Sequence, residues 1–311
     1  MPADGGRRTI GGVLLRGLQG KALYGYGPGR AGAWGWVGKG SAVGLKHVVL
    51  VALGIVFIFP IFWMVATSLK SSAQVFSIPP AYFPSPIDLG NYPSAMGYAP
   101  FGRYFLNSLL YCVGSTIGVV LSCSLVGYGF ACIRWRGRDA VFVVVLSALM
   151  LPFLVTMIPL FVLFKYLGLD GTLWPLIIPY FFGSSAFGIF LLRQFFRTVP
   201  ESLREAARID GASELWILVR VVVPLSRSAL ASLALFQFIY AWNDFLGPLI
   251  YVNKASYFTV SIGLQQFLTS HGAQWNLLMA AAAVATAPIV VLFFFTQKTF
   301  IQGVTFSGLN E

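Results

Sequence analysis

The side chains of this 311-residue chain that could do chemistry are few and isolated. Three cysteines lie close together in the sequence, Cys112, Cys123 and Cys132. Their spacing matches no zinc site, and His271 has no second ligand at metal-binding spacing. The acids Asp139 and Asp170 stand alone, and no Gly-x4-Gly-Lys-Ser/Thr segment is present to hold a nucleotide. We therefore expect no metal, no resident cofactor and no enzymatic activity.

One charged segment has the composition of a docking surface. It lies between long apolar runs and reads Glu205, Ala206, Ala207, Arg208, Ile209, Asp210, Gly211, Ala212 and Ser213. Small side chains allow a second protein to approach the backbone closely, and Glu205 and Asp210 offer negative charge to a basic cleft. Such a combination of residues is suited to binding a soluble partner rather than to catalysis.

A single acid, Asp244, lies within the apolar stretch 229–252. A carboxylate inside a membrane span is costly and normally faces a cavity or a partner. With Trp242 and Asn243 it could line a polar path for a solute. Equally, Asp244 could lie near the outer headgroups or cap a broken helix before Gly247. The sequence leaves both readings open.

Composition sets the class of protein. Hydrophobic residues make up 57% of the chain and charged residues 10%, whereas a soluble domain has about 25% charged residues. A transmembrane helix needs about 20 apolar residues. Six stretches meet this length with at most one charge inside: 46–70, 103–134, 139–165, 170–193, 229–252 and 276–297. The sequence predicts an all-α integral membrane protein with six transmembrane helices over residues 47–298.

Basic residues give the orientation. They concentrate before the first span, after the second and after the fourth, the last group being Arg193, Arg197, Arg204, Arg208, Arg220 and Arg227. The positive-inside rule places these segments in the cytoplasm, together with a basic, Gly-rich tail at 1–46 and a tail at 299–311. This bias accounts for the net charge of +11, so nucleic acid is not expected as a partner. The chain should reside in the cell membrane, in contact with membrane lipid, and the sequence assigns no role to its N-terminal tail.

Two loops are expected on the exterior. Segment 71–102 contains six prolines, which favour an extended connection. Segment 253–275 combines aromatic and amide side chains, a mixture that suits a sugar or a docked protein. Tryptophan and tyrosine also gather at every bilayer interface, so the second loop allows either interpretation.

The cytoplasmic loop 198–224 can be interpreted in detail. Thr198 and Glu201 have the spacing of a capping box, which predicts a short helix that Gly211 ends. Ser213 can cap a second helix that ends near Pro224. In that helix the expected buried stripe is Leu215, Leu218, Val219 and Val222.

Several motifs together resemble one family. The sequence Glu205-Ala206-Ala207, followed by Asp210-Gly211-Ala212 and Pro224-Leu225, is similar to the EAA loop of binding-protein-dependent ABC importer permeases. Ala241-Trp242-Asn243-Asp244-Phe245, Leu151-Pro152 through Phe161, Gly168 through Thr172, Asn107-Ser108 and Gly303 resemble the smaller permease of maltose-type transporters. The resemblance covers about residues 47–308.

The resemblance implies the type I ABC importer permease fold and a carbohydrate-import function. It implies that Glu205, Ala206, Ala207, Asp210, Gly211, Ala212 and Ser213 couple to a cytosolic ATPase. The implied partners are a second permease, two copies of the ATPase, which bind the ATP, and an extracytoplasmic sugar-binding protein. Trp242, Asn243 and Asp244 are candidates for the substrate path.

A second function class remains open on the sequence. A secondary, ion-coupled transporter of small solutes would need no ATPase. Such transporters usually carry more charges inside the spans or clear paired half-repeats. Uptake that continues without ATP but with a proton gradient would favour this alternative.

Overall fold

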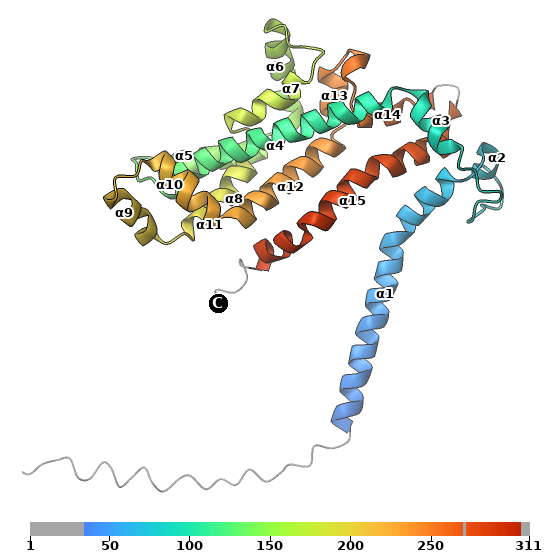
Figure 1. Ribbon diagram of the computed structural model, residues 1–311, viewed down its shortest axis with the longest axis horizontal. Coiled ribbons are helices and arrows are strands. Elements are labelled where there is room, and N and C mark those ends of the chain that lie inside the picture. The colour runs from blue at the N-terminus through green and yellow to red at the C-terminus, as the bar shows by residue number, and fades with distance from the viewer. Residues whose placement is uncertain (1–33, 270–271, 306–311) are drawn as a thin grey trace, which may run out of the picture. The chain divides into compact units, whose positions relative to one another are not determined.

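The computed structural model describes residues 34–269 and 272–305, and for 34–43 and 298–305 only the backbone (Figure 1). Residues 1–33 of the predicted N-terminal tail, His271 and residues 306–311 lie outside this part. The long helices are α1 (Trp34–Ser68), α4 (Phe101–Ala131), α12 (Arg227–Asn243) and α15 (Trp275–Thr305). Helices of intermediate length are α3 (Asn91–Tyr98), α5 (Arg138–Ser147), α6 (Phe153–Tyr166), α8 (Ala186–Arg197) and α9 (Glu201–Ile209).

Short elements connect these helices. They are α2 (Ser72–Val75), α7 (Trp174–Ile177), α10 (Glu214–Ile217), α11 (Val223–Leu225), α13 (Leu246–Tyr251) and α14 (Val260–Gln265). Three 3-10 turns cover Ala148–Met150, Ile178–Phe182 and Ala255–Tyr257, and one π-helical turn covers Leu218–Val222. The strands β1 (Leu268–Thr269) and β2 (Gly272–Ala273) pair antiparallel.

The apolar helices account for the six expected spans. Within the described residues, four segments are long and apolar enough to cross a membrane: Gly44–Ser68, Phe101–Ala131, Trp174–Arg197 and Trp275–Gln297. Two further candidates are bent pairs, Arg138–Met150 with Phe153–Tyr166 at 96° and Glu214–Leu225 with Arg227–Asn243 at 84°. Counting each pair once gives six spans. We assign the fifth span to α12 onward, because the charged segment before the bend belongs to the 198–224 loop.

Contacts divide the chain into two units at Pro60. The described part of the first unit is helix α1 up to Pro60; the helix begins at Trp34 and therefore extends into the segment expected to be a tail. Its side chains from Val48 to Phe59 are largely exposed apolar groups, as befits a helix surrounded by lipid or by another chain. At the other end of the chain, α15 likewise continues past the expected boundary at residue 298.

Helix α4 is the centre of the second unit and packs on α8 and α12. Small residues allow the close approach of these helices, as is usual between membrane helices. A methyl group on Gly188 would lie 2.8 Å from Cys123 Sγ and 3.0 Å from Leu233 Cδ1, so only glycine fits there. All three cysteines are free and buried, which agrees with a packing role.

One of the two segments expected on the exterior is more ordered than the sequence suggested. Segment 253–275 is not an open loop, because α14 packs on α4 and α15. Asn107 Nδ2 on α4 donates to the carbonyl oxygens of Ser256 and Phe258 at 3.0 and 2.9 Å. Ser108 Oγ accepts from the Val260 amide at 2.9 Å. These buried polar contacts explain the role of the Asn-Ser pair on α4, which the sequence motif alone did not reveal.

Candidate functional site

The charged segment 205–213 forms a tight reversal between α9 and α10. Gly211 adopts φ = 80°, a left-handed conformation that favours glycine. The Ala212 amide donates to the Ala207 carbonyl at 2.9 Å, and the Gly211 amide donates to the Arg208 carbonyl at 3.0 Å. These two bonds form a Schellman motif, which satisfies the last carbonyls of α9. The predicted stop at Gly211 is confirmed.

The start of α9 differs from the prediction. The capping box is wrong, because the Thr198 hydroxyl donates to the Phe195 carbonyl at 2.7 Å and thus closes α8. Pro200 precedes the first turn of α9, and no side chain caps it. The Glu201 carboxylate instead contacts Arg134 Nη2 at 3.2 Å.

The second helix begins as predicted, since Ser213 Oγ accepts from the Trp216 amide at 3.3 Å. The predicted buried stripe is only half correct. Leu218 and Val222 are buried, but Leu215 and Val219 are 61% and 52% exposed, and Ile217 faces the core instead. The π-helical turn after Ile217 inserts an additional residue, which rotates the following side chains away from the expected register.

Polar contacts tie this loop to the end of α4. Buried Arg204 donates through Nη1 to the Cys132 carbonyl at 3.3 Å. The Tyr128 hydroxyl on α4 donates to Glu214, and Arg208 Nε contacts the other oxygen of Glu214 at 2.7 Å. The Arg208 guanidinium holds the pKa of the Glu214 carboxyl below its ordinary value. A displacement of the loop must therefore act on α4.

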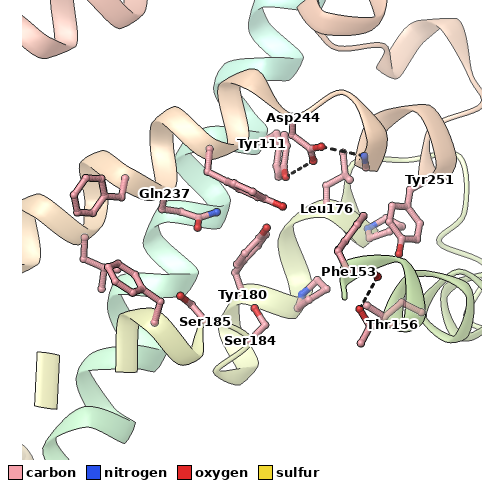
Figure 2. Close-up of a pocket in the computed structure, with 18 residues that line it drawn as sticks. Tyr111, Phe153, Thr156, Leu176, Tyr180, Ser184, Ser185, Gln237, Asp244 and Tyr251 are labelled. Atoms are coloured by element: carbon pink, nitrogen blue, oxygen red, sulfur yellow. Dashed lines mark hydrogen bonds between the residues drawn. The ribbon is translucent and has the colours of Figure 1, made fainter. Parts of the chain in front are cut away.

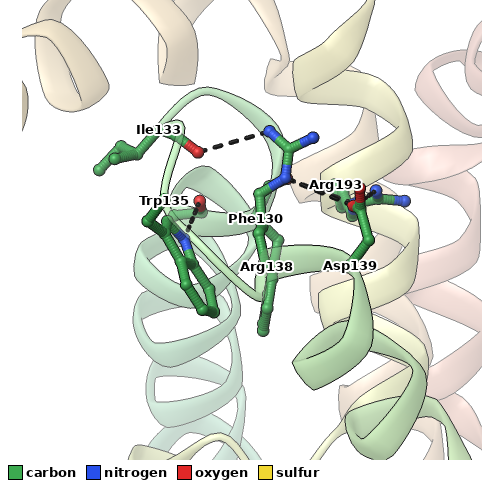
Figure 3. Close-up of polar contacts among 7 residues, drawn as sticks. Phe130, Ile133, Trp135, Arg138, Asp139 and Arg193 are labelled. Atoms are coloured by element: carbon green, nitrogen blue, oxygen red, sulfur yellow. Dashed lines mark hydrogen bonds and ion pairs between the residues drawn. The ribbon is translucent and has the colours of Figure 1, made fainter.

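A further contact ties α8 to the same end of α4 (Figure 3). Arg193 is buried, lies 3.1 Å through Nη2 from Asp139, and donates through Nε to the Phe130 carbonyl at 3.4 Å. Its guanidinium also lies 4.0 Å from the centre of the Phe142 ring. Asp139 on α5 and Arg193 on α8, which mark the ends of expected spans in the sequence, thus form one ion pair between these helices.

The predicted docking residues are mostly on the surface. Glu205, Ala206, Asp210, Gly211 and Ser213 are exposed, while Ala207 and Ala212 are half-buried. Within the part of the chain that the structure describes, the Glu205 and Asp210 carboxylates make no hydrogen bond or ion pair. Exposed apolar side chains surround them: Leu203, Ile209, Leu215 and Trp216. In Figure 1, α9 and α10 lie at the α5 end of α4, opposite α3 and α14. This surface has the mixed polar and apolar character of a protein interface.

A cavity of about 470 Å³ lies between α4, α12 and the segments 153–187 and 244–251 (Figure 2). Its polar lining comprises Tyr111, Thr156, Tyr180, Ser184, Ser185, Gln237, Tyr240, Asp244 and Tyr251. Asp244 Oδ2 accepts from the Tyr111 hydroxyl at 2.9 Å, and Oδ1 accepts from the Gly247 amide at 3.0 Å. Asp244 therefore both lines the cavity and fixes the break between α12 and α13. The sequence left open whether Asp244 lines a polar cavity or caps a broken helix, and the structure shows that it does both.

The other two predicted path residues point elsewhere. Trp242 is buried, donates through Nε1 to the Ala285 carbonyl at 3.1 Å, and stacks on Phe238. Asn243 is exposed and donates to the Ile239 carbonyl at 2.8 Å. Both line a different cavity, of about 340 Å³, beside α14 and α15. The structure thus separates Asp244 from its two neighbours.

The comparisons with known proteins agree with this geometry. Residues 114–306, more than half of the chain, match the family described as "Binding-protein-dependent transport system inner membrane component". The chain belongs to this family. The relationship that the EAA-like loop predicted is confirmed, as is the prediction of a multi-pass membrane permease.

Individual relatives cover most of the chain. The arabinooligosaccharides transport system permease protein AraQ of Bacillus subtilis (strain 168) is 32% identical over 83% of this permease and 92% of its own length. The osmoprotective compounds uptake permease protein GgtD of Synechocystis sp. (strain ATCC 27184 / PCC 6803 / Kazusa) is 32% identical over 83% of this permease and 89% of its own length.

A solved structure supports the fold. A chain of a bacterial ABC transporter that imports the acidic polysaccharide alginate superposes with a TM-score of 0.73 at 23% identity. The match covers 84% of this permease and 97% of that chain. The importer-permease fold that the sequence predicted is therefore confirmed.

Proposed function

We propose that this chain is the permease subunit of an ATP-driven importer of a sugar or oligosaccharide. A second permease would form the other half of the path, two copies of a cytosolic ATPase would supply the energy, and an extracytoplasmic binding protein would deliver the sugar. The chain itself performs no catalysis. Both termini and the 198–224 loop lie in the cytoplasm, in accord with the excess of basic residues there.

The observation that carries the proposal is the exposed reversal at Gly211. A segment with two unpaired acids and small side chains, held by charged contacts on α4, is suited to receive force from a partner. In this proposal Glu205, Ala206, Ala207, Asp210, Gly211, Ala212 and Ser213 contact the ATPase. Closure of the two ATPases on ATP would move the loop, and α4 would carry the movement to α8 and α12 beside the cavity. Such rigid-body motion opens the path alternately to each side.

The names of the relatives support a sugar or oligosaccharide as the solute. AraQ is named for arabinooligosaccharides and GgtD for osmoprotective compounds, and the two are equally identical to this chain. Their different solutes leave the particular sugar to be determined by experiment. Asp244, and less directly Trp242 and Asn243, remain our candidates for the path.

The test is a crosslink combined with uptake. The full complex is purified from a strain in which the permease carries Ala206→Cys, and a short thiol-reactive crosslinker is added. We expect a crosslink to the nucleotide-hydrolysing subunit, and no such crosslink from Ser94→Cys on α3. In vesicles, sugar uptake should require ATP and should persist when the proton gradient is collapsed. Uptake driven by a proton gradient without ATP would instead support the secondary transporter.

A further inference from the structure

From the cavity, and resting on the proposed function, we infer that this subunit itself holds a binding site for an uncharged saccharide. The site comprises Tyr111, Tyr180, Gln237, Tyr240 and Asp244. It would exclude acidic saccharides. The solute would thus contact named residues of this permease and not only the binding protein or the second permease.

The first observation is an unsatisfied buried amide. Gln237 on α12 is 8% exposed and lines the cavity, and its Nε2 makes no hydrogen bond of regular geometry among the described residues, being only loosely placed against the Tyr180 hydroxyl. A buried donor without a partner is costly, so such groups normally have a ligand or water to bind. In Figure 2, Gln237 and Tyr180 approach the same space from opposite sides. A hydroxyl-bearing solute in that space would satisfy the amide.

The second observation is the combination of lining side chains. Four of the eighteen lining residues are tyrosines, and serine and threonine hydroxyls lie beside them. Aromatic faces pack on the apolar faces of sugar rings, while the phenol, amide and carboxylate groups bind the hydroxyls. The volume of about 470 Å³ lies within the range of about 300–1,000 Å³ that small-molecule sites usually have.

The third observation is the charge. Among the eighteen lining residues, Asp244 is the single carboxylate, and none is a lysine, arginine or histidine. Asp244 accepts hydrogen bonds from Tyr111 and from the Gly247 amide, which leaves acceptor capacity for a sugar hydroxyl. A carboxylate or phosphate on the solute would meet a like charge with no cation to compensate it. The cavity therefore selects against anions.

The experiment measures protection of a thiol in the assembled complex. Ser184→Cys places a reporter in the lining, and Ser94→Cys on α3 is an exposed control outside it. The three native cysteines are buried and provide little background. Labelling by a maleimide is followed while maltotriose, arabinotriose or trigalacturonate is added. We expect at least one neutral trisaccharide to slow labelling at position 184 but not at position 94, and trigalacturonate to be at least about tenfold less effective.

Two variants assign the effect to the proposed groups. Gln237→Leu keeps the size of the side chain and should raise the half-protecting concentration about three- to tenfold, the effect of one or two lost hydrogen bonds. Gln194→Leu on the exposed face of α8 is its control and should change nothing. Asp244→Asn removes the charge and should let trigalacturonate protect almost as well as the neutral sugars.

The outcomes are distinct. If no neutral trisaccharide protects Ser184→Cys, or if trigalacturonate protects the unaltered site equally well, the saccharide site is overturned. If protection responds to added phospholipid or detergent and not to sugar, the cavity is a lipid site and the inference is wrong. ATP-dependent uptake in either case would leave the proposed function standing. Uptake that needs no ATP would contradict the proposed function, whatever the result of the labelling experiment.

Discussion

The coupling loop, residues 198–224, and the saccharide cavity are built in opposite ways. The loop is one continuous segment, largely exposed, whose shape depends on local caps and on charged contacts with α4. The cavity is assembled from four separate segments and is lined by tyrosines around one carboxylate. The loop is therefore suited to transmit force, and the cavity to select a solute. Mutations should be able to damage one property while sparing the other.

The largest expected effect concerns the reversal of the loop. Gly211→Val places a β-branched residue at φ = 80°, a conformation that costs L-residues about 1–2 kcal/mol or more. A methyl group at this position would meet nothing within 4 Å, so the penalty comes from the backbone alone. We expect ATP-driven uptake to fall more than tenfold while saccharide protection of Ser184→Cys is unchanged. Gly102→Val, at an open helical position, is the matched control.

The corresponding change beside the cavity is Gly247→Ala. A methyl group on Gly247 would lie 2.4 Å from Asp244 Oδ2 and 3.1 Å from Leu176 Cδ2, so Asp244 must move. We expect uptake at low sugar concentration to fall about tenfold, through a higher half-saturating concentration. Hydrolysis of ATP by the assembled complex should remain near the normal rate. A variant that loses hydrolysis and uptake together would contradict the separation of the two regions.

The acids of the loop allow a finer comparison. Glu214→Ala removes the acceptor of the Tyr128 hydroxyl and the partner of Arg208, which leaves a polar group unsatisfied at a cost of about 1–3 kcal/mol. Glu201→Ala removes a pair whose side chains are 84% and 48% exposed, and such pairs contribute about 0–1 kcal/mol. We expect several-fold poorer coupling, measured as sugar imported per ATP hydrolysed, from the first variant and little change from the second. Equal effects would show that α4 is not tied to the loop through Glu214.

The carboxylate of Glu214 predicts a response of the loop to pH. Its pKa is lowered in the folded protein, so its contribution to stability is present above the ordinary value of 4.5 and is lost as pH falls through the lowered pKa. We expect amide hydrogen exchange in 205–217, corrected for the intrinsic exchange rate at each pH, to be constant from neutral pH down to the ordinary value, and to rise below it relative to corrected exchange in α4. Glu214→Gln should lack this additional rise. An increase that begins near neutral pH would contradict the assignment to Glu214.

The sequence was more informative about the loop than about the cavity, and the reason is physical. Gly211 and Ser213 act on their nearest neighbours in the chain, so residue type and spacing predict the turn and the cap. The π-helical turn at Leu218–Val222, by contrast, has no signature in residue type or spacing that would have predicted it. Tyr111, Tyr180 and Gln237 are ordinary residues of apolar helices in the sequence. They become a site only because α4, the 178–182 turn and α12 converge.

The smallest expected effect tests the boundary of the cavity. Trp242 neighbours Asp244 in the sequence, yet it faces α15 and binds the Ala285 carbonyl. Trp242→Phe keeps an aromatic ring but removes this hydrogen bond and some buried volume, so the cost should be about 1–3 kcal/mol of stability. We expect a slightly lower unfolding temperature of the complex and an unchanged half-protecting sugar concentration at Ser184→Cys. A change in sugar selectivity would instead extend the path to the second cavity beside α14. Trp242 lies in the last turn of α12, whereas Asp244 follows the end of that helix with an extended backbone. The two side chains therefore point in different directions, and the variant tests that geometric separation directly.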